Sequence, residues 1–475
     1  MADPQLAAGA GHVDDRWDLA AERSRLLYEA RDVVAVELAE SAAFLAGLAP
    51  DRFASVAYRA RPGRPFVQPR GGVPDLAQQR LLTQALDAAG ADFLPLTVDS
   101  VTRHNDYAEA ARLLEVGRRE GRDLLNGYPL VCHGVEATRG LYEGIARPVS
   151  LRHGTPDARL LVEVALASGI AEIEGGGLSY TLPYSKNFPL DRALSHWQYV
   201  DRLCAQVGPT DRPVHRESFG PLTATLVPPV ITIAVQVCEL VLAAEQGVRS
   251  FAVSFGQSGN LEQDLATADV LRDQSHRWLA HLGLGPVELR LVYHQWMGAF
   301  PVEPELAWQL IAVASTISAL VAADKVVIKT PSEALGIPSP ESNARSVRAV
   351  QYVLDMLAAP SVLRSDAVSA EADLIGQEVD SVLGRVFDHP SASLVAAVHR
   401  AVLDGTLDVP FAPHEANAGR LVCGRSADRR IRIVTPGAVP IGAAQLRRER
   451  ELFEGTAPDD RPLWERLLHD VRMLA

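Results

Sequence analysis

From about Arg64 to Pro331 the chain alternates short extended runs with longer segments of helical periodicity, such as Asp191–Val207 and Leu306–Ala323. Nine of the short runs have the length and composition of strands: Pro65–Pro69, Phe93–Val98, Tyr128–Val131, Pro148–Leu151, Ile170–Ile173, Val214–Ser218, Ser250–Phe255, Val287–His294 and Lys325–Lys329. Alternating strands and helices predict a parallel sheet with right-handed crossovers.

Polar and glycine-rich residues lie at or near the ends of these runs. They are Arg70-Gly71-Gly72, Thr102-Arg103, Asn126-Gly127, Arg152-His153-Gly154, Glu174-Gly175-Gly176-Gly177, Phe219-Gly220 and Lys329-Thr330, of which only Asn126-Gly127 precedes its run. In a TIM barrel the catalytic groups gather at the C-terminal strand ends, but an open doubly wound sheet binds its ligand there too. The repeat count favours an α/β fold with a (β/α)8 TIM barrel, in which one of the nine runs is a loop or an accessory strand.

Sequence outside this alternation predicts two extensions. Residues from about Trp17 to Arg61 have helical patterns, more helices follow Ala359, and Pro410–Pro440 contains the alternating Ile431-Arg432-Ile433. We therefore predict an N-terminal helical extension (1–62), a catalytic barrel (63–358) and a C-terminal α+β extension (359–475). Two apolar stretches, Pro221–Cys238 and Leu306–Ala323, contain prolines or polar residues, which favours helices packed on a sheet over membrane spans.

Composition narrows the functional classes. The formal charge of −13 argues against nucleic acid or an anionic membrane as a partner, because both require a basic surface. The four cysteines are far apart and form no Cys-x-x-Cys pair, which indicates free thiols in a reducing cytoplasm. The histidines show no metal-ligand spacing, so we expect no protein-bound metal.

Charged side chains at the strand ends suggest an amino dicarboxylate as ligand. Arg70, Arg103 and Arg152 each follow a separate predicted strand, and a guanidinium group can bind a carboxylate through two hydrogen bonds. Glu174 ends another run and could hold an ammonium group or act as a base, although it could equally form a salt bridge with a neighbouring arginine. Tyr180 and Tyr184 follow it and offer flat walls and phenol donors.

Lysine is scarce in this chain: Lys186, Lys325 and Lys329 are the only three. Lys329 ends a predicted strand and Glu333 follows four residues later. A desolvated lysine at a barrel strand end is typical of a Schiff-base aldolase, which is an alternative from a different reaction class.

Five strings in order resemble one known family. They are Leu124-Leu125-Asn126-Gly127-Tyr128-Pro129, Arg152-His153-Gly154-Thr155-Pro156-Asp157, Glu174-Gly175-Gly176-Gly177-Leu178-Ser179-Tyr180, His294-Gln295-Trp296-Met297-Gly298 and Lys329-Thr330-Pro331. From about Pro69 to Pro440 the chain resembles the epsilon, or large, subunit of adenosylcobalamin-dependent glutamate mutase. The resemblance implies a TIM barrel that interconverts L-glutamate and threo-3-methyl-L-aspartate, an isomerase reaction started by a 5′-deoxyadenosyl radical.

The resemblance also implies roles for particular residues. Glu174 and Arg103 are implied to be catalytic. The implied substrate-binding residues are Arg70, Arg103, Arg152, His153, Glu174, Tyr180 and Tyr184. The implied cofactor-binding residues are Gly72, Asn126, Pro183, Phe300, Lys329, Glu333 and Ile337.

Partners follow from the same resemblance. Adenosylcobalamin is implied to be delivered by a separate small subunit with an Asp-x-His-x-x-Gly motif, which this chain lacks. A dimer of large subunits is expected. A related mutase acting on another amino or dicarboxylic acid, and a non-catalytic scaffold for the small subunit, are further alternatives. The sequence does not distinguish a catabolic from a biosynthetic pathway.

Overall fold

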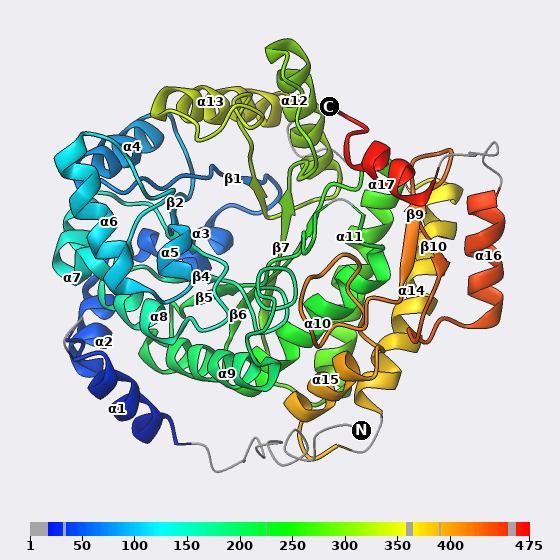
Figure 1. Cartoon of the computed structure of the whole chain (residues 1–475), viewed down its shortest axis with the longest axis horizontal. Coiled ribbons are helices and arrows are strands. Elements are labelled where there is room, and N and C mark those ends of the chain that lie inside the picture. Colours follow the sequence, from blue (N-terminus) through cyan, green and yellow to red (C-terminus); the bar gives the residue numbers. More distant parts are fainter. Residues whose placement is uncertain (1–17, 32–34, 225, 358–363, 389–390, 455–461) are drawn as a thin grey trace.

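A computed structural model describes residues 18–31, 35–224, 226–357, 364–388, 391–454 and 462–475. Eight parallel strands are hydrogen bonded in the order β1-β8-β7-β6-β5-β4-β3-β2, and Figure 1 views them end-on inside a ring of helices. The strands are β1 (Phe66–Gln68), β2 (Leu94–Thr97), β3 (Val149–Arg152), β4 (Glu172–Glu174), β5 (His215–Glu217), β6 (Ser250–Gly256), β7 (Glu288–His294) and β8 (Lys325–Val327). The predicted (β/α)8 barrel is confirmed.

Strands β1 and β2 stand at the two ends of the hydrogen-bonded order, and irregular bonds join them. The carbonyl of Val67 accepts from the amides of Asp92 (3.0 Å) and Phe93 (3.3 Å), and the carbonyl of Gly71 accepts from Thr97 (2.9 Å). These bonds close the barrel at a seam that has no regular ladder.

One of the nine predicted strands is not part of the barrel. Tyr128 forms an isolated parallel bridge with Val98, and helix α7 begins two residues later at Leu130. Tyr128–Val131 is therefore the surplus run. Its apolar residues are buried because they begin a packed helix, which explains why periodicity alone could not separate it from the strands.

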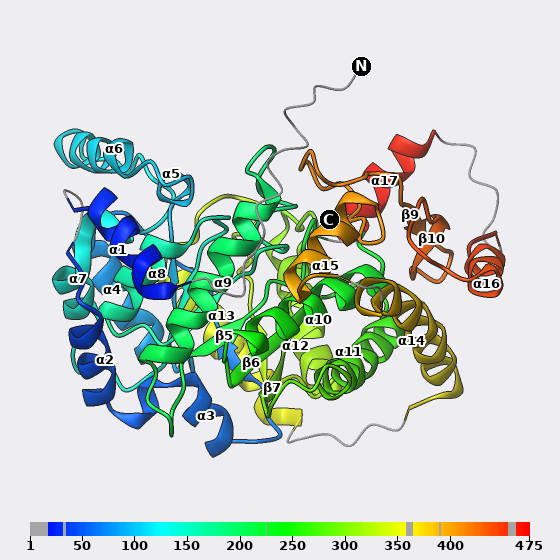
Figure 2. The ribbon, with the colours of Figure 1, turned by 90° about the horizontal axis from the view of Figure 1, so that it is seen from below.

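A helix covers the outside of the barrel after each strand. These helices are α4 (Leu76–Ala88), α7 (Leu130–Leu141), α8 (Arg159–Ala167), α9 (Leu190–Val207), α10 (Pro229–Glu245), α11 (Leu261–His281), α12 (Pro304–Leu320) and α13 (Pro340–Leu357). Two further helices, α5 (Ser100–Arg103) and α6 (Tyr107–Glu120), follow β2, and Figure 2 shows them projecting above one end of the barrel. Proline at the first turn of α10 and α12 fits a position where the missing amide costs no helical hydrogen bond.

Residues 229–238 and 306–320 of the two apolar stretches lie in α10 and α12, so the prediction of helices is confirmed for these parts. Every residue of α10 from Pro229 to Ala244 is buried between the barrel and the C-terminal segments. Within the described ranges, no helix combines the length and the apolar character that crossing a bilayer requires.

The N-terminal end of the barrel is closed by aromatic side chains. Helix α3 (Ala54–Ala60) lies under it (Figure 2), and Tyr58 contacts Phe66 and Phe93 at ring-centroid distances of 5.4 and 5.3 Å. Tyr58 also lies 5.1 Å from the ring of His215 on β5. This aromatic plug leaves the C-terminal strand ends as the open face.

Further elements flank the barrel on both sides in sequence. Before it come α1 (Leu19–Glu29), α2 (Leu38–Gly47), a short 3-10 turn at Pro50–Arg52, and α3. After it come α14 (Asp366–Phe387), α15 (Leu394–Leu403), the antiparallel hairpin β9 (Val422–Arg425) and β10 (Ile431–Thr435), α16 (Ala443–Glu454) and α17 (Leu463–Val471). The predicted C-terminal boundary at 358/359, like residues 1–17 of the predicted N-terminal extension, lies outside the described residues.

Candidate active site

Parallel pairing brings the predicted polar residues to one face. Arg152, Glu174, Glu217 and His294 are the last residues of β3, β4, β5 and β7. Since all eight strands point the same way, these four side chains meet at the C-terminal end of the barrel.

Arg152 lies at the centre of this group and is 6% exposed. Its Nη2 donates to Oε1 of Glu174, and its Nη1 lies 3.3 Å from Oε1 of Glu217. Burial alone would lower the pKa of Arg152, but the charges of Glu174 and Glu217 hold it above its ordinary value. The guanidinium group therefore stays charged between two carboxylates.

Glu174 is buried, and both of its carboxylate oxygens accept hydrogen bonds. Oε1 accepts from Arg152 and Oε2 accepts from the hydroxyl of Tyr180. Burial raises the pKa of Glu174, and the positive charge of Arg152 opposes that rise. Glu174 thus forms the salt bridge with a neighbouring arginine that the sequence left open as one of two interpretations, and it does so at the C-terminal end of the barrel.

Three glycines after Glu174 allow the loop to pack tightly. Gly175 has φ +117°, and a Cβ atom there would lie 2.3 Å from the ring of Tyr180 and 2.6 Å from that of Trp197. A Cβ at Gly176 would lie 2.0 Å from the carboxylate of Glu239, which accepts from the amides of Leu178 and Ser179 on the same loop. The glycine run therefore fixes where Tyr180 stands relative to Glu174.

Aromatic rings form one wall of the site. Tyr180 contacts Tyr184 at 5.7 Å, Phe219 at 5.7 Å and His153 at 4.9 Å between ring centroids. His153 is stacked on Trp197, and its Nδ1 accepts from the amide of Thr155 at 3.2 Å. Burial, followed by the charges of nearby arginines, lowers the pKa of His153 well below its ordinary range, so the ring is neutral.

Arg103 and Arg70 lie near Tyr184, but they have different hydrogen-bond and ion-pair partners. The Nε of Arg103 donates to the carbonyl of Val98 at 2.8 Å, and no carboxylate of the described residues lies within ion-pair distance of Arg103. Arg70 pairs with Glu333 at 3.1 Å, and its side chain is 44% exposed. Burial and then Glu174 raise the pKa of Tyr184 to about 12 against the opposing charges of Arg70, Arg103 and Arg152, so all three arginines act on this one phenol.

A second set of predicted residues lines a pocket of about 260 Å³ at the barrel mouth. The set consists of Arg70, Gly72, Asn126, Lys329, Glu333 and Ile337. Lys329 pairs with Glu333, and burial, followed by the charge of Arg70, lowers the pKa of Lys329 to about 8. A Cβ at Gly72 would lie 2.0 Å from the carbonyl oxygen of Thr97, so only glycine fits the close approach of these loops.

Two predicted cofactor residues do not line this pocket. Pro183 is half-buried beside Tyr184 on the loop after β4, and Phe300 is 6% exposed on the loop after β7. Ile337, which does line it, is 64% exposed at the rim.

Sequence reasoning missed Glu217, His294 and Lys325 as site residues. Glu217 is the second partner of Arg152. The ring of His294 lies 3.8 Å from Glu217, and Lys325 pairs with Glu217 at 2.6 Å from the side of the aromatic plug. The run His215-Arg216-Glu217-Ser218 carried a signal, because a buried barrel strand with so many polar residues is unusual. Arg216 on that strand points outward instead, to Asp201 at 2.6 Å.

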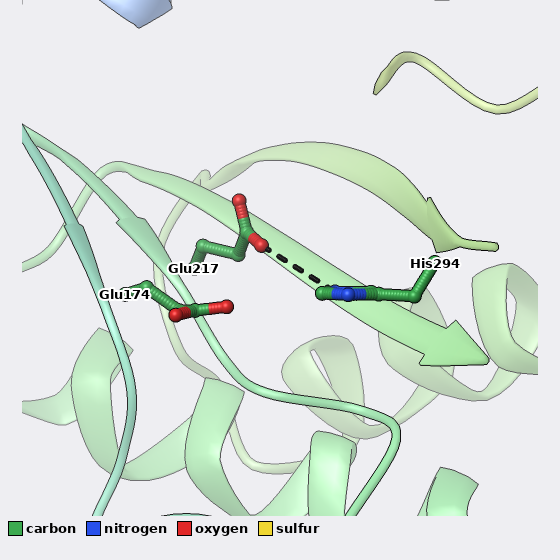
Figure 3. Close-up of side chains that lie close together, drawn as sticks. All are labelled: Glu174, Glu217 and His294. Atoms are coloured by element: carbon green, nitrogen blue, oxygen red, sulfur yellow. Dashed lines mark ion pairs between the residues drawn. The ribbon is translucent and has the colours of Figure 1, made fainter. Parts of the chain in front are cut away.

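Glu174, Glu217 and His294 also converge closely enough to suggest a metal site, as Figure 3 shows. Their nearest ligand atoms lie within 4.8 Å of one another. However, Arg152 already occupies the space between both carboxylates, and Lys325 binds Glu217. Since cationic side chains already balance these carboxylates, the arrangement does not favour a metal ion.

The chain matches known proteins over most of its length. Residues 50–474 match the family model "Methylaspartate mutase E chain (MutE)". The chain belongs to this family. The curated glutamate mutase epsilon subunit of Halobacterium salinarum is 43% identical over 409 residues, which cover 86% of this chain and 84% of that protein.

Relatives from other lineages agree. The glutamate mutase epsilon subunits of Desulfitobacterium hafniense and Treponema denticola are each 40% identical, over 86% and 90% of this chain and 85% and 88% of those proteins. A solved tryptophan synthase α subunit from Legionella pneumophila overlays with a TM-score of 0.34 at 12% identity, over 68% of this chain and all of that chain. The resemblance inferred from the five sequence strings is confirmed, and the chain is a member of an isomerase family.

Proposed function

We propose that this chain is the large catalytic subunit of an adenosylcobalamin-dependent glutamate mutase, which interconverts L-glutamate and threo-3-methyl-L-aspartate. The observation that carries the proposal is the buried cluster of Arg152, Glu174 and Glu217 on the open face of the barrel, with Arg70 and Arg103 beside it. Membership in the family supports the reaction class. The cytoplasm is the expected compartment, where the four free cysteines stay reduced.

Arg70, Arg103 and Arg152 bind the two substrate carboxylates. Arg103 is half-buried and free of carboxylate partners among the described residues, so its fork of donors is available for a ligand. His153 is neutral and adds a hydrogen-bonding group without adding charge. Binding two carboxylates at once fixes the carbon chain between them, which orients the atoms that rearrange.

Glu174 binds the substrate ammonium group, assisted by Tyr180. In the structure the guanidinium of Arg152 serves as the cation for Glu174. When substrate binds, its carboxylate pairs with Arg152 and its ammonium group pairs with Glu174, so no buried charge is left unpaired. Tyr180, Tyr184 and Phe219 cover the substrate and exclude water, which a radical reaction requires.

The residues that hold the cofactor are Gly72, Asn126, Pro183, Phe300, Lys329, Glu333 and Ile337. The pocket at the mouth fits part of a large group, because Gly72 gives close backbone access and the Lys329–Glu333 pair offers both hydrogen-bond donors and acceptors. When bound, adenosylcobalamin supplies the radical that starts the rearrangement. Glu174 and Arg103 then hold the reacting fragments in place while the carbon skeleton changes.

A separate small subunit carries the cobalamin. The present chain has no Asp-x-His-x-x-Gly motif, so the small subunit would hold the cofactor and the residues at the barrel mouth of this chain would cover it. We expect a dimer of large subunits with a small subunit at each barrel mouth.

Reconstitution tests this function. The purified full chain with adenosylcobalamin and L-glutamate should show no turnover, and adding a small subunit with the motif should restore it to a plateau as the partner is titrated. Full activity of the chain without a second polypeptide would contradict the two-component proposal. Turnover of another amino or dicarboxylic acid, but not of glutamate, would move the substrate assignment to that compound.

A further inference from the structure

Lys325 has no role in the function proposed above, yet it is one of only three lysines in the chain and is fully buried inside the barrel. Its Nζ pairs with Glu172 on β4 and lies 2.6 Å from Oε2 of Glu217 on β5. The ammonium group also lies 4.9 Å from the ring centroid of Phe93 in the aromatic plug. Lys325 therefore sits between the closed end of the barrel and the candidate active site.

A line of alternating charges runs from this lysine to the substrate site. Lys325 binds one oxygen of Glu217, the other oxygen of Glu217 faces Arg152 at 3.3 Å, and Arg152 pairs with Glu174. Four of the eight strands contribute to this line, namely β8, β5, β3 and β4. Each carboxylate and each cation in it has an oppositely charged neighbour on at least one side.

Lys325 is paired with both Glu172 and Glu217, and the pKa values of these two carboxyl groups differ. Burial would raise the pKa of Glu217, but Lys325 and then Arg152 hold it below its ordinary value, so Glu217 is ionised. For Glu172, burial outweighs the attraction of the same lysine and raises the pKa to about 7. Glu217 also faces His294 from β7, whose pKa burial lowers well below its ordinary range, so that ring brings no competing charge.

Stability alone does not explain why Lys325, Glu172 and Glu217 are buried together inside the barrel. Barrel interiors are usually filled by branched apolar side chains, and buried ion pairs add little net stability over apolar replacements of similar size. A lysine ammonium is a compact point charge, which suits the closed barrel interior where Lys325 meets Glu172 and Glu217. The presence of lysine in a chain that otherwise uses arginine fits this steric demand.

We propose that Lys325 is a positioning residue for substrate binding, which fixes Glu217 as the permanent counter-ion of Arg152 so that Glu174 can leave Arg152 for the substrate ammonium group. The proposal rests on the function assigned above. If Glu217 did not hold Arg152, Glu174 would be its only carboxylate partner, and Arg152 would lack a counter-ion whenever Glu174 turned to the ammonium group before the substrate carboxylate was in place. Lys325 thereby acts through Glu217 and Arg152 and does not touch the substrate.

The test compares variants that each remove one charge from the buried group formed by Lys325, Glu217 and Glu172. Lys325→Met and Glu217→Gln should each raise the Kd of the full chain for L-glutamate, measured by calorimetry, about thirtyfold. In the reconstituted enzyme KM should rise similarly while kcat changes less than about threefold. Glu172→Gln, the matched control, removes the other partner of Lys325 but leaves Lys325 with Glu217, so Kd and KM should stay within about twofold of wild type.

The double variant Lys325→Met/Glu217→Gln decides whether the two residues act as one unit. Since Lys325 acts through Glu217, the double variant should bind glutamate no more weakly than either single variant, whereas independent effects would multiply. The double variant also removes one positive and one negative charge, so its folded fraction should exceed that of Lys325→Met in a thermal melt.

Several outcomes would overturn the proposal. A wild-type Kd in folded Lys325→Met would do so, as would equal losses in Lys325→Met and Glu172→Gln or multiplying losses in the double variant. Measurements on the wild-type protein distinguish a failure of this proposal from a failure of the proposed function. If wild type neither binds nor converts glutamate, the proposed function fails, and if it does both while the variants match it, only the role of Lys325 fails.

Discussion

The deep cluster and the mouth pocket of the barrel use similar residues in different surroundings. Arg152 and Glu174 are 7% and 2% exposed in their side chains, whereas Arg70 and Glu333 are 44% and 25% exposed. In the deep cluster each charge is desolvated, so a lost partner leaves an uncompensated ion. At the mouth, water reaches Arg70 and Glu333 and screens their charges, so the loss of this pair costs little. Substitutions should therefore have large effects in the deep cluster and small effects at the mouth.

Replacing Arg152 with lysine tests the deep cluster most severely. Lysine keeps the charge but cannot reach both Glu174 and Glu217 and a substrate carboxylate, so the loss of glutamate binding should be about 2–5 kcal/mol. Steady-state kinetics of the reconstituted enzyme would measure it as a higher KM, while assembly with the small subunit stays intact. Arg432→Lys is the matched control, because Arg432 is equally buried between Glu371 and Glu449 but lies in the C-terminal extension, so Tm should fall without a change in KM. An unchanged KM in Arg152→Lys would remove Arg152 from the substrate site.

Glu174→Gln keeps the shape of the side chain and removes its charge. Because Glu174 is fully buried, transition-state stabilisation should fall by about 3 kcal/mol, the upper range for a hydrogen bond to a charged group. Arg152 retains Glu217, so the fold should tolerate the change. Turnover per folded molecule and Tm should be measured on one sample. A lower Tm with unchanged turnover per folded molecule would show that Glu174 serves only as a structural salt bridge.

Arg103→Lys should have an intermediate effect. Arg103 is half-buried and has no carboxylate partner among the described residues, so its replacement leaves no buried carboxylate behind. We expect a loss of about 1.5 kcal/mol in glutamate binding, at the lower end for hydrogen bonds to charged groups. Calorimetry with L-glutamate measures this loss directly. A loss as large as that of Arg152→Lys would show that Arg103 belongs energetically to the deep cluster.

The smallest effect is expected at the mouth and depends on pH. The pKa of Lys329 is lowered to about 8, so its ammonium group is charged below that pH and becomes neutral as the pH rises through it. Affinity for adenosylcobalamin in the assembled enzyme, followed by absorbance titration, should therefore fall about threefold between pH 7 and pH 9, which corresponds to one hydrogen bond weakened by the loss of charge. Lys329→Met should abolish this dependence and the exposed Lys186→Met should retain it. Identical pH profiles in wild type and Lys329→Met would assign the titration to another group.

The amino-acid sequence determined the repeating units and the strand ends. Its alternation of strand and helix predicted eight of the eight barrel strands, and the glycine run after Glu174 marked the loop that positions Tyr180. These features depend on a few neighbouring residues, because local periodicity and backbone freedom act over short distances. Arg152 and Glu174 could be recognised for the same reason, as charged residues at the ends of apolar runs.

Only the tertiary structure decided which charges meet inside the barrel. Lys325 and Glu172 are separated by 153 residues, and Arg152 and Glu217 by 65, so their pairing depends on how the strands are ordered and tilted around the barrel. The irregular seam between β1 and β2, and the exclusion of Tyr128–Val131 from the sheet, also required three dimensions. A residue type and its position along a strand are local properties, whereas the partner of a buried charge is set by the closed barrel that surrounds it.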